Sequence, residues 1–211
     1  MGNILVVSPH PDDESIGCGG TLRKHVLDGD QVQAIFLTSG ERGGHGRSLE
    51  ETKNLREQEA TEAAAILGLE KIEFWQVRNG ALRTTPKLVD RLRQRITQWA
   101  ANVIYVTHDR EMHEEHRIAA RLVRRAVSGL APHVSKPEVL MFEVWTPLQR
   151  MDQIVDITPY IDTKIAAIRA HKSQCDVLSF DDAFLGLARY RGEMFCWPEG
   201  EYAEIFAQVR F

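Results

Sequence analysis

The chain has 211 residues, a net charge of -4, 43% hydrophobic residues and 27% charged residues. This composition is that of an ordinary globular protein, and it gives no support to a disordered, collagen-like or coiled-coil class. A pI near 6.1 provides no basic field for a phosphate backbone, so we do not expect nucleic acid as a partner. No segment approaches the roughly 18 apolar residues that span a bilayer. The length predicts one domain over residues 1–211, with about 176–211 as a less regular C-terminal extension.

The alternation of short apolar runs with longer amphipathic stretches predicts βαβ units and a mostly parallel sheet. The expected strands are Ile4–Val7, Val32–Thr38, Ile72–Trp75, Val103–Thr107 and Val139–Val144. The expected helices are Ser15–Asp28, Asn54–Leu67, Pro86–Ala100, His113–Ser128 and Pro159–Lys172. We therefore predict an α/β fold, a Rossmann-like three-layer sandwich with its site at the carboxyl ends of the strands.

Two segments are expected to be loops, and the last part of the chain is less regular. Gly40–Leu49 is polar and glycine-rich, and Leu130–Pro137 separates the βα repeat from the last third of the chain. Beyond Phe180 we expect a helix near Asp181–Arg191 and a closing strand near Glu204–Phe211.

The cysteines favour a reducing compartment. Cys18, Cys175 and Cys196 are odd in number and contain no Cys-x-x-Cys pair, which is untypical of a disulfide framework. The N-terminus also lacks the basic and apolar regions of a signal peptide. A cytoplasmic location is the expectation.

Polar clusters follow three of the expected strands. They are His10–Glu14 after the first strand, Ser39–Arg47 after the second and His108–His116 after the fourth. In an open α/β sheet the carboxyl ends of the strands gather at the ligand-binding edge. The three clusters therefore predict a single site, and Trp145, which follows the fifth strand, can line the same cleft.

The first cluster has the donors of a metal site. His10 and Asp13 are three residues apart across a turn that Pro11 stiffens, so both can face one cation. Asp12 and Asp13 are adjacent and need not face the same way, so one can ligate a metal while its neighbour reaches a metal-bound water. The alternative is that an aspartate only caps the following helix, but a cap needs one acceptor and this turn supplies several.

The second cluster adds imidazoles. His113 and His116 are separated by three positions and lie on one face of a helix. Imidazole together with carboxylate suits a first-row divalent ion, as in catalytic zinc or non-haem iron sites. No thiolate completes a structural site, so we expect a catalytic metal that activates water, with an acidic neighbour as the base.

Several motifs together resemble one known family. They are PHPDDE after the first strand, SGERG after the second, LREQEATEAAAILG on the next helix, HEEH opening a later helix and, more weakly, AHKSQ at Ala170–Gln174. The chain resembles the LmbE-like, or PIG-L, family of zinc-dependent de-N-acetylases, which includes the mycothiol and bacillithiol biosynthetic deacetylases. The resemblance implies removal of an acetyl group from an N-acetylglucosamine-type amino sugar in a small glycoside or glycoconjugate.

The resemblance also implies roles for individual residues. It makes His10, Asp13 and His116 the ligands of Zn²⁺, with Fe²⁺ or another divalent ion as the alternative. It makes Asp12 the general base, His113 the group that stabilises the oxyanion, and Glu115 the carboxylate that orients His113. The expected substrate-binding residues are Arg56, Glu41 and His171.

The chain departs from the family pattern at the second cluster. The family usually has His-Pro-Asp-His where this chain has His113-Glu114-Glu115-His116. Proline is lost and the orienting carboxylate is one methylene longer. The role of His113 is therefore less firmly implied than the metal site, although a glutamate can still accept an imidazole proton.

Other readings stay open. A thiol-conjugate amidase or another C–N hydrolase could use the same metal site, and a sugar-binding module derived from a deacetylase would need no base beside the metal. A homo-oligomer is compatible with the sequence. Gly17, Gly19 and Gly20 resemble part of a dinucleotide fingerprint but do not match its spacing, so we expect them to allow close packing of helix on sheet.

Overall fold

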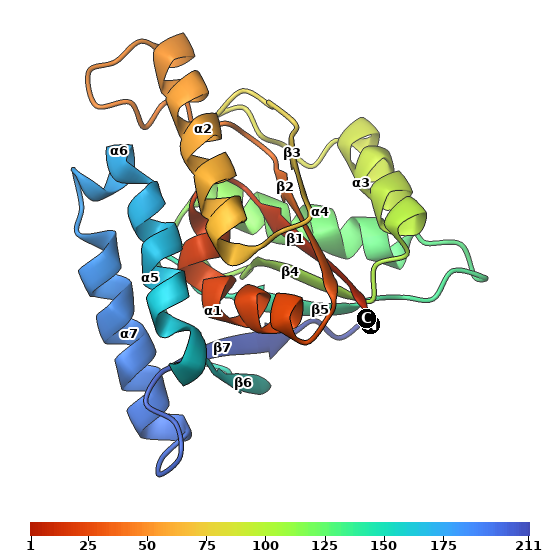
Figure 1. Cartoon of the computed structure of the whole chain (residues 1–211). Coiled ribbons are helices and arrows are strands. Elements are labelled where there is room, and N and C mark those ends of the chain that lie inside the picture. Colours follow the sequence, from red (N-terminus) through yellow and green to blue (C-terminus); the bar gives the residue numbers. More distant parts are fainter.

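The structure is a computed structural model that describes all residues, 1–211, and it contains one seven-stranded sheet with helices on both faces (Figure 1). The strand order is β3-β2-β1-β4-β5-β7-β6. The strands are β1 (Asn3–Ser8), β2 (Gln31–Phe36), β3 (Lys71–Phe74), β4 (Val103–Thr107), β5 (Glu138–Phe142), β6 (Gln153–Asp156) and β7 (Ala203–Gln208). The α/β prediction is confirmed, as is the mostly parallel sheet.

The helices are α1 (Asp13–Leu27), α2 (Leu49–Leu67), α3 (Pro86–Trp99), α4 (Glu114–Ser128), α5 (Ile161–Ala170), α6 (Lys172–Cys175) and α7 (Phe180–Phe195), with a 3₁₀ turn at Thr158–Tyr160. The helices pack on the two faces of the sheet through two separate apolar clusters. The cluster of α3 and α4 includes Leu92 and Leu122. The other cluster includes Leu22 of α1, Ala63 of α2 and Ile168 of α5. None of the helices combines the length and the apolar character that crossing a membrane requires.

The strand order of the sheet reverses at β1, and the expected site lies at this point. β1 pairs in parallel with β2 on one side and with β4 on the other. The loops after β1 and β4 therefore leave the sheet side by side, toward opposite faces, and leave a crevice between them. The expected convergence of the first and third polar clusters follows directly from this topology.

Helix α1 packs unusually closely on its surroundings. A side-chain carbon on Gly17 would overlap the Phe142 ring of β5, and one on Gly20 would lie 2.8 Å from Ile157. The helix is kinked at Cys18, where φ is -145° and ψ is 16°. The expected packing of helix on sheet is confirmed for Gly17, whereas Gly20 lets α1 approach Ile157 outside the strands and Gly19 has only ordinary contacts with Lys164 and Leu67.

Helix α2 starts earlier than predicted, at Leu49 rather than Asn54. Ser48 and Glu51 form a capping box, in which each side chain accepts a hydrogen bond from the other residue's backbone N–H. This motif satisfies free donors of the first turn, so the helix extends into the segment that we expected to be loop.

The last third contains elements that the sequence patterns did not predict. β6 and α6 were absent from the prediction, and α5 ends at Ala170. β7 lies between β5 and β6 and is antiparallel to both. Residues 176–211 thus contain helix α7 and strand β7, and β7 is an interior strand of the same sheet.

Candidate metal centre

The turn after β1 brings four polar residues into the interior. Asp12 occupies the N-cap position of α1 with φ at 120°, a left-handed conformation that costs free energy for a residue with a side chain. Its carboxylate makes no capping hydrogen bond. Asp13 instead accepts a hydrogen bond from the backbone N–H of His10 at 2.9 Å. The capping alternative therefore does not explain Asp12, and the turn holds both carboxylates for another purpose.

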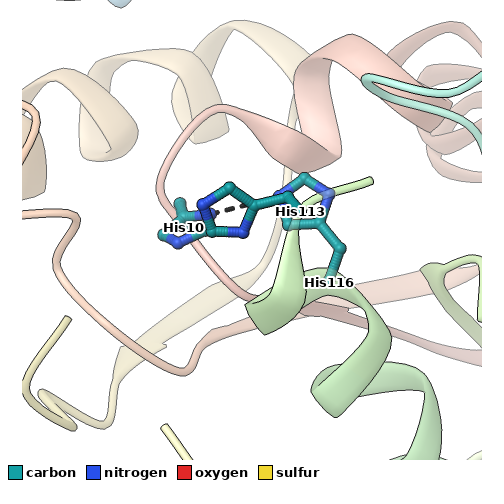
Figure 2. A group of neighbouring side chains, drawn as sticks. All are labelled: His10, His113 and His116. Atoms are coloured by element: carbon teal, nitrogen blue, oxygen red, sulfur yellow. Dashed lines mark hydrogen bonds between the residues drawn. The ribbon is translucent and has the colours of Figure 1, made fainter. Parts of the chain in front are cut away.

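Three histidines meet at this turn. Figure 2 shows His10 from the β1 loop facing His113 and His116 at the start of α4. The three residues offer nitrogen atoms that all lie within 4.8 Å of one another, so they could hold a metal ion.

A tighter group includes Asp13. His10 Nδ1 and His116 Nε2 are 3.3 Å apart. Asp13 Oδ2 lies 3.3 Å from His10 Nδ1, and its Oδ1 lies 3.2 Å from His116 Nε2. Ligand atoms of a tetrahedral site with bonds of about 2.0 to 2.2 Å are roughly 3.3 to 3.6 Å apart. The donors and their spacing therefore fit a small divalent cation.

The pKa values show that this position favours a positive charge, which a proton on His10 supplies in the absence of a metal ion. Burial lowers the pKa of His116 to about 3, so its ring is neutral and a nitrogen lone pair is free. Burial alone would lower the pKa of His10, but contacts with Asp13 and Glu115 raise it to about 9. Burial raises the pKa of Asp13, yet the contact with His116 and the hydrogen bonds and charge of His10 together hold this pKa well below its usual range.

Glu115 contacts a different histidine from the one expected. Its Oε2 lies 2.9 Å from His10 Nε2, and its Oε1 accepts hydrogen bonds from the backbone N–H groups of Gly80 and Leu82 at 2.8 and 3.3 Å. The expectation that the Glu115 carboxylate orients His113 is therefore wrong. The longer glutamate side chain reaches across α4 to the β1 turn.

The backbone of Glu115 orients His113 instead. The N–H of Glu115 donates to His113 Nδ1 at 3.3 Å, which makes His113 the N-cap of α4. A neutral imidazole that accepts at Nδ1 carries its proton on Nε2. Burial lowers the pKa of His113, which favours this neutral form. His113 thus retains one N–H donor.

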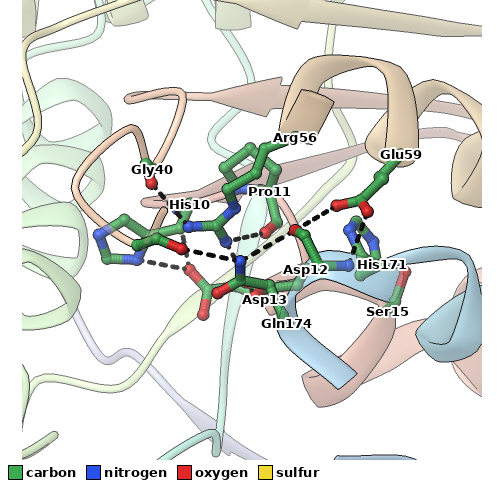
Figure 3. A network of polar contacts seen from close by, with 12 residues as sticks. His10, Pro11, Asp12, Asp13, Ser15, Gly40, Arg56, Glu59, His171 and Gln174 are labelled. Atoms are coloured by element: carbon green, nitrogen blue, oxygen red, sulfur yellow. Dashed lines mark hydrogen bonds and ion pairs between the residues drawn. The ribbon is translucent and has the colours of Figure 1, made fainter. Parts of the chain in front are cut away.

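Asp12 is paired with Arg56. The guanidinium donates to Asp12 Oδ2 at 2.9 Å and to the backbone oxygens of Pro11 and Gly40 (Figure 3). Burial raises the pKa of Asp12 to about 6 although the Arg56 charge opposes that shift. Arg56, which we expected to bind substrate, is 5% exposed and donates these hydrogen bonds to protein atoms.

A cavity of about 280 Å³ opens beside this cluster. Its polar lining includes His10, Asp12, Asp13, Arg42, Arg56, Asn79, His113 and Gln174, and its apolar lining is Ile16, Val144, Trp145 and Phe180. The place expected for Trp145 is confirmed, and its ring lies edge-on to Phe180 at 5.7 Å.

Two expected substrate-binding residues lie outside that lining. Glu41 accepts a hydrogen bond from the backbone N–H of Asn79 at 2.7 Å. His171 is 1% exposed and lies 3.6 Å from Glu14 Oε1, behind the β1 turn. Neither residue therefore lies where a substrate in this cavity would touch it.

Asn79 is a site residue that the sequence reasoning missed. Its Nδ2 donates to Glu115 Oε2 at 2.5 Å, and the residue lines the cavity. The signal was its position after the third strand, at the same sheet edge as the other clusters. Gly80 follows Asn79 in the sequence, and an Asn-Gly pair is typical of an ordinary turn, which hid this signal.

The fold and the site define a Rossmann-like α/β protein with a histidine and carboxylate constellation at the switch point of its sheet. The family model of the GlcNAc-PI de-N-acetylases, PIG-L, matches residues 5–127, and the chain belongs to this family. The match includes the β1 turn and the start of α4.

Deacetylases of N-acetylglucosamine compounds are among the relatives. Diacetylchitobiose deacetylase of Thermococcus kodakarensis is 29% identical, over 90% of this chain and 78% of that protein. A probable N-acetyl-alpha-D-glucosaminyl L-malate deacetylase 2 of Bacillus cereus is 26% identical, over 85% of this chain and 86% of that protein.

The structural similarity extends to another kind of enzyme. The structure of the 4-carboxy-2-hydroxymuconate hydratase GalB of Pseudomonas putida has a TM-score of 0.87 and 25% identity, over 100% of this chain and 97% of that one. The chain is thus similar both to deacetylases and to a hydratase.

Proposed function

We propose that the chain is a zinc-dependent deacetylase that hydrolyses the N-acetyl group of an N-acetylglucosamine-type sugar in a small glycoside or glycoconjugate. The observation that carries the proposal is the spacing of 3.2 to 3.3 Å among donor atoms of His10, Asp13 and His116. Asp12 lines the same cavity as His10 and Asp13. The deacetylase relatives supply the substrate class.

In this proposal His10, Asp13 and His116 hold the ion. His113 is left out of the ligand set because its Nδ1 accepts the N–H of Glu115. When bound, zinc lowers the pKa of water from near 16 to about 7 and polarises the amide carbonyl. The contact between Glu115 and His10 fixes that ring, as carboxylates commonly do behind a metal-bound histidine.

The protein side chains divide the proton transfers between them. Asp12 accepts a proton as the water oxygen attacks the acetyl carbon, and its pKa near 6 suits a base at neutral pH. Arg56 holds that carboxylate in place. The Nε2–H group of His113 donates a hydrogen bond to the oxyanion of the tetrahedral intermediate. The C–N bond then breaks, acetate is released, and the proton taken up by Asp12 returns to the amine.

The proposed enzyme acts in the cytoplasm, in line with free Cys18, Cys175 and Cys196. Its partner is a small amino-sugar substrate. The cavity of about 280 Å³ favours a sugar with its acetamido group at the metal, while the ring of Trp145 supplies an apolar wall.

Acetate release tests the proposal. The protein is stripped with a chelator and reloaded with Zn²⁺, Fe²⁺ or no metal, and acetate is measured with N-acetylglucosamine, diacetylchitobiose and N-acetylglucosaminyl malate. We expect hydrolysis that disappears on chelation and returns best with Zn²⁺. Hydrolysis unaffected by complete metal removal would contradict the proposal.

The hydratase relative favours a second candidate, the addition of water to a carbon–carbon double bond. Both reactions need an activated water, and the acceptor differs. Hydratase activity is assayed in parallel with conjugated unsaturated carboxylic acids, whose absorbance is lost when water adds to the double bond. The thiol-conjugate amidase alternative is tested with substrates that carry larger N-acyl groups. Turnover of these compounds without acetate release from any sugar would replace the deacetylase assignment.

A further inference from the structure

Glu111, in the loop between β4 and α4, is a buried carboxylate that the proposed function does not use. It is 1% exposed. Its Oε1 accepts hydrogen bonds from the backbone N–H groups of Val144 and Thr146 at 2.8 and 3.2 Å. This oxygen ties the loop after β4 to the loop after β5, and it leaves the second oxygen free.

The second oxygen faces a metal-site histidine. Glu111 Oε2 and His116 Nδ1 are both buried, and neither has a hydrogen-bond partner. They lie 3.8 Å apart, and both side chains are 0% exposed. A buried polar atom without a partner is costly, and here two such atoms lie opposite each other. A hydrogen bond between these two atoms would need them to approach by a few tenths of an ångström.

The tautomer of His116 makes this contact significant. His116 Nε2 is the atom that lies 3.2 Å from Asp13 and 3.3 Å from His10. A neutral imidazole that ligates through Nε2 carries its hydrogen on Nδ1, and that hydrogen needs an acceptor. Glu111 Oε2 is the carboxylate oxygen that faces Nδ1.

We infer that Glu111 is a positioning residue of the metal centre, which accepts the Nδ1 hydrogen of His116 and so presents the Nε2 lone pair to the ion. The inference rests on the ligand set in the proposed function. Glu115 lies in the same way behind His10, with Oε2 at 2.9 Å from Nε2. Each ligating imidazole is thus backed by its own glutamate, one on either side of His113 in the sequence.

The variant Glu111→Gln isolates this contact. The glutamine carbonyl oxygen can still accept the two backbone N–H groups that Oε1 accepts. Its NH₂ then faces His116 Nδ1 and favours the opposite tautomer, in which Nε2 is protonated and cannot ligate. The tie between the loops is kept while the acceptor is removed.

Glu59→Gln is the matched control. Glu59 is 4% exposed and accepts hydrogen bonds from the N–H and the hydroxyl of Ser173, both at 2.7 Å. Like Glu111→Gln, the Glu59→Gln variant replaces a buried carboxylate with an amide. Residue 59 makes its hydrogen bonds to Ser173 and not to a proposed ligand. His116→Ala is the reference for loss of a ligand.

Zinc affinity is measured by competition with a chromophoric chelator, and the thermal midpoint of each metal-free variant is recorded. We expect Glu111→Gln to weaken zinc binding by about 10- to 100-fold, the range typical of an outer-shell partner. The metal-free midpoint should stay at the parent value. Glu59→Gln should bind zinc as the parent does, and His116→Ala should lose the site.

The outcomes separate the two claims. Parent-like affinity in Glu111→Gln, with binding lost in His116→Ala, overturns the role of Glu111 and leaves the metal site standing. Parent-like affinity in His116→Ala overturns the proposed ligand set. If Glu111→Gln does not fold, nitrogen-15 NMR of the zinc-loaded parent decides: a slowly exchanging Nδ1 hydrogen on His116 supports the inference, and a rapidly exchanging one refutes it.

Discussion

Buried charged groups occur in two regions of this molecule, and the two regions treat them differently. In the C-terminal region Lys164 donates to Glu204 at 2.5 Å, and Arg191 donates to Glu143 at 2.8 Å. Glu204 also accepts the backbone N–H groups of Gly20 and Thr21. These pairs join helices to neighbouring strands, and every charge has a partner.

At the candidate metal centre several buried polar groups lack hydrogen-bond partners. Glu111 Oε2, His116 Nδ1 and both ring nitrogens of His171 are buried without hydrogen-bond partners. Donor atoms of His10, Asp13 and His116 converge instead. The converging donor atoms of His10, Asp13 and His116, and not the unpartnered atoms, are the groups that a bound cation would satisfy. The contrast separates charges that hold the fold from donor atoms that are available to a ligand.

The largest effect on the functional side is expected from Asp12→Asn. The amide keeps the size of the side chain but cannot accept the proton, so turnover should fall by about 10²- to 10⁴-fold. Zinc affinity should be retained, because Asp12 is outside the proposed ligand set. Acetate release and zinc titration of one preparation check both expectations. Parent-like turnover would remove Asp12 from the reaction.

On the structural side Lys164→Met should lower the free energy of unfolding by about 3 to 5 kcal/mol, because Glu204 is left buried and unpaired. Urea titration measures the change. Zinc affinity of the folded protein should not move. The double variant Lys164→Met with Glu204→Leu should recover much of the loss, and a double variant no more stable than the single one would show that the charge was not the cause.

His113→Ala tests the site from its other side. Removing one oxyanion donor should slow turnover by about 10²- to 10³-fold, or 3 to 4 kcal/mol. Zinc binding should persist, because Nδ1 of His113 is occupied by the helix cap. Steady-state kinetics and zinc titration separate these effects, and loss of zinc in this variant would favour the set of three histidines.

The smallest effect is expected at an exposed polar pair. Ser48→Ala removes the capping box of α2 and should lower the free energy of unfolding by about 1 kcal/mol. Turnover should be unchanged, because Ser48 is exposed and lies outside the cavity lining. A chemical denaturation curve beside an activity assay checks this, and reduced turnover would place the loop before α2 in the reaction cycle.

The meeting of the first and third polar clusters was predictable because local pattern and topology agree there. His10, Asp12 and Asp13 follow β1 directly, and His116 returns to them because β4 pairs with β1. The sequence predicted side-chain partners less well. The reach of Glu115 to His10, rather than to His113, depends on the separation of α4 from the β1 turn, which no local pattern encodes.

The fold shows the same division. The parallel strands were predictable because buried strands form continuous apolar runs. The short edge strand β6 was not, since its residues are mostly exposed and its pairing with β7 is long-range. The start of α2 had a local signal, the spacing of Ser48 and Glu51, and it was overlooked within a glycine-rich stretch.

A crystal structure of the zinc-loaded protein, with anomalous data collected on both sides of the zinc edge, tests the central claim most directly. We expect one strong anomalous peak within bonding distance of His10 Nδ1, His116 Nε2 and an Asp13 carboxylate oxygen, with the His113 ring unbound beside it. A peak ligated by His113 in place of Asp13, or no peak at this cluster at full zinc occupancy elsewhere, would contradict the account.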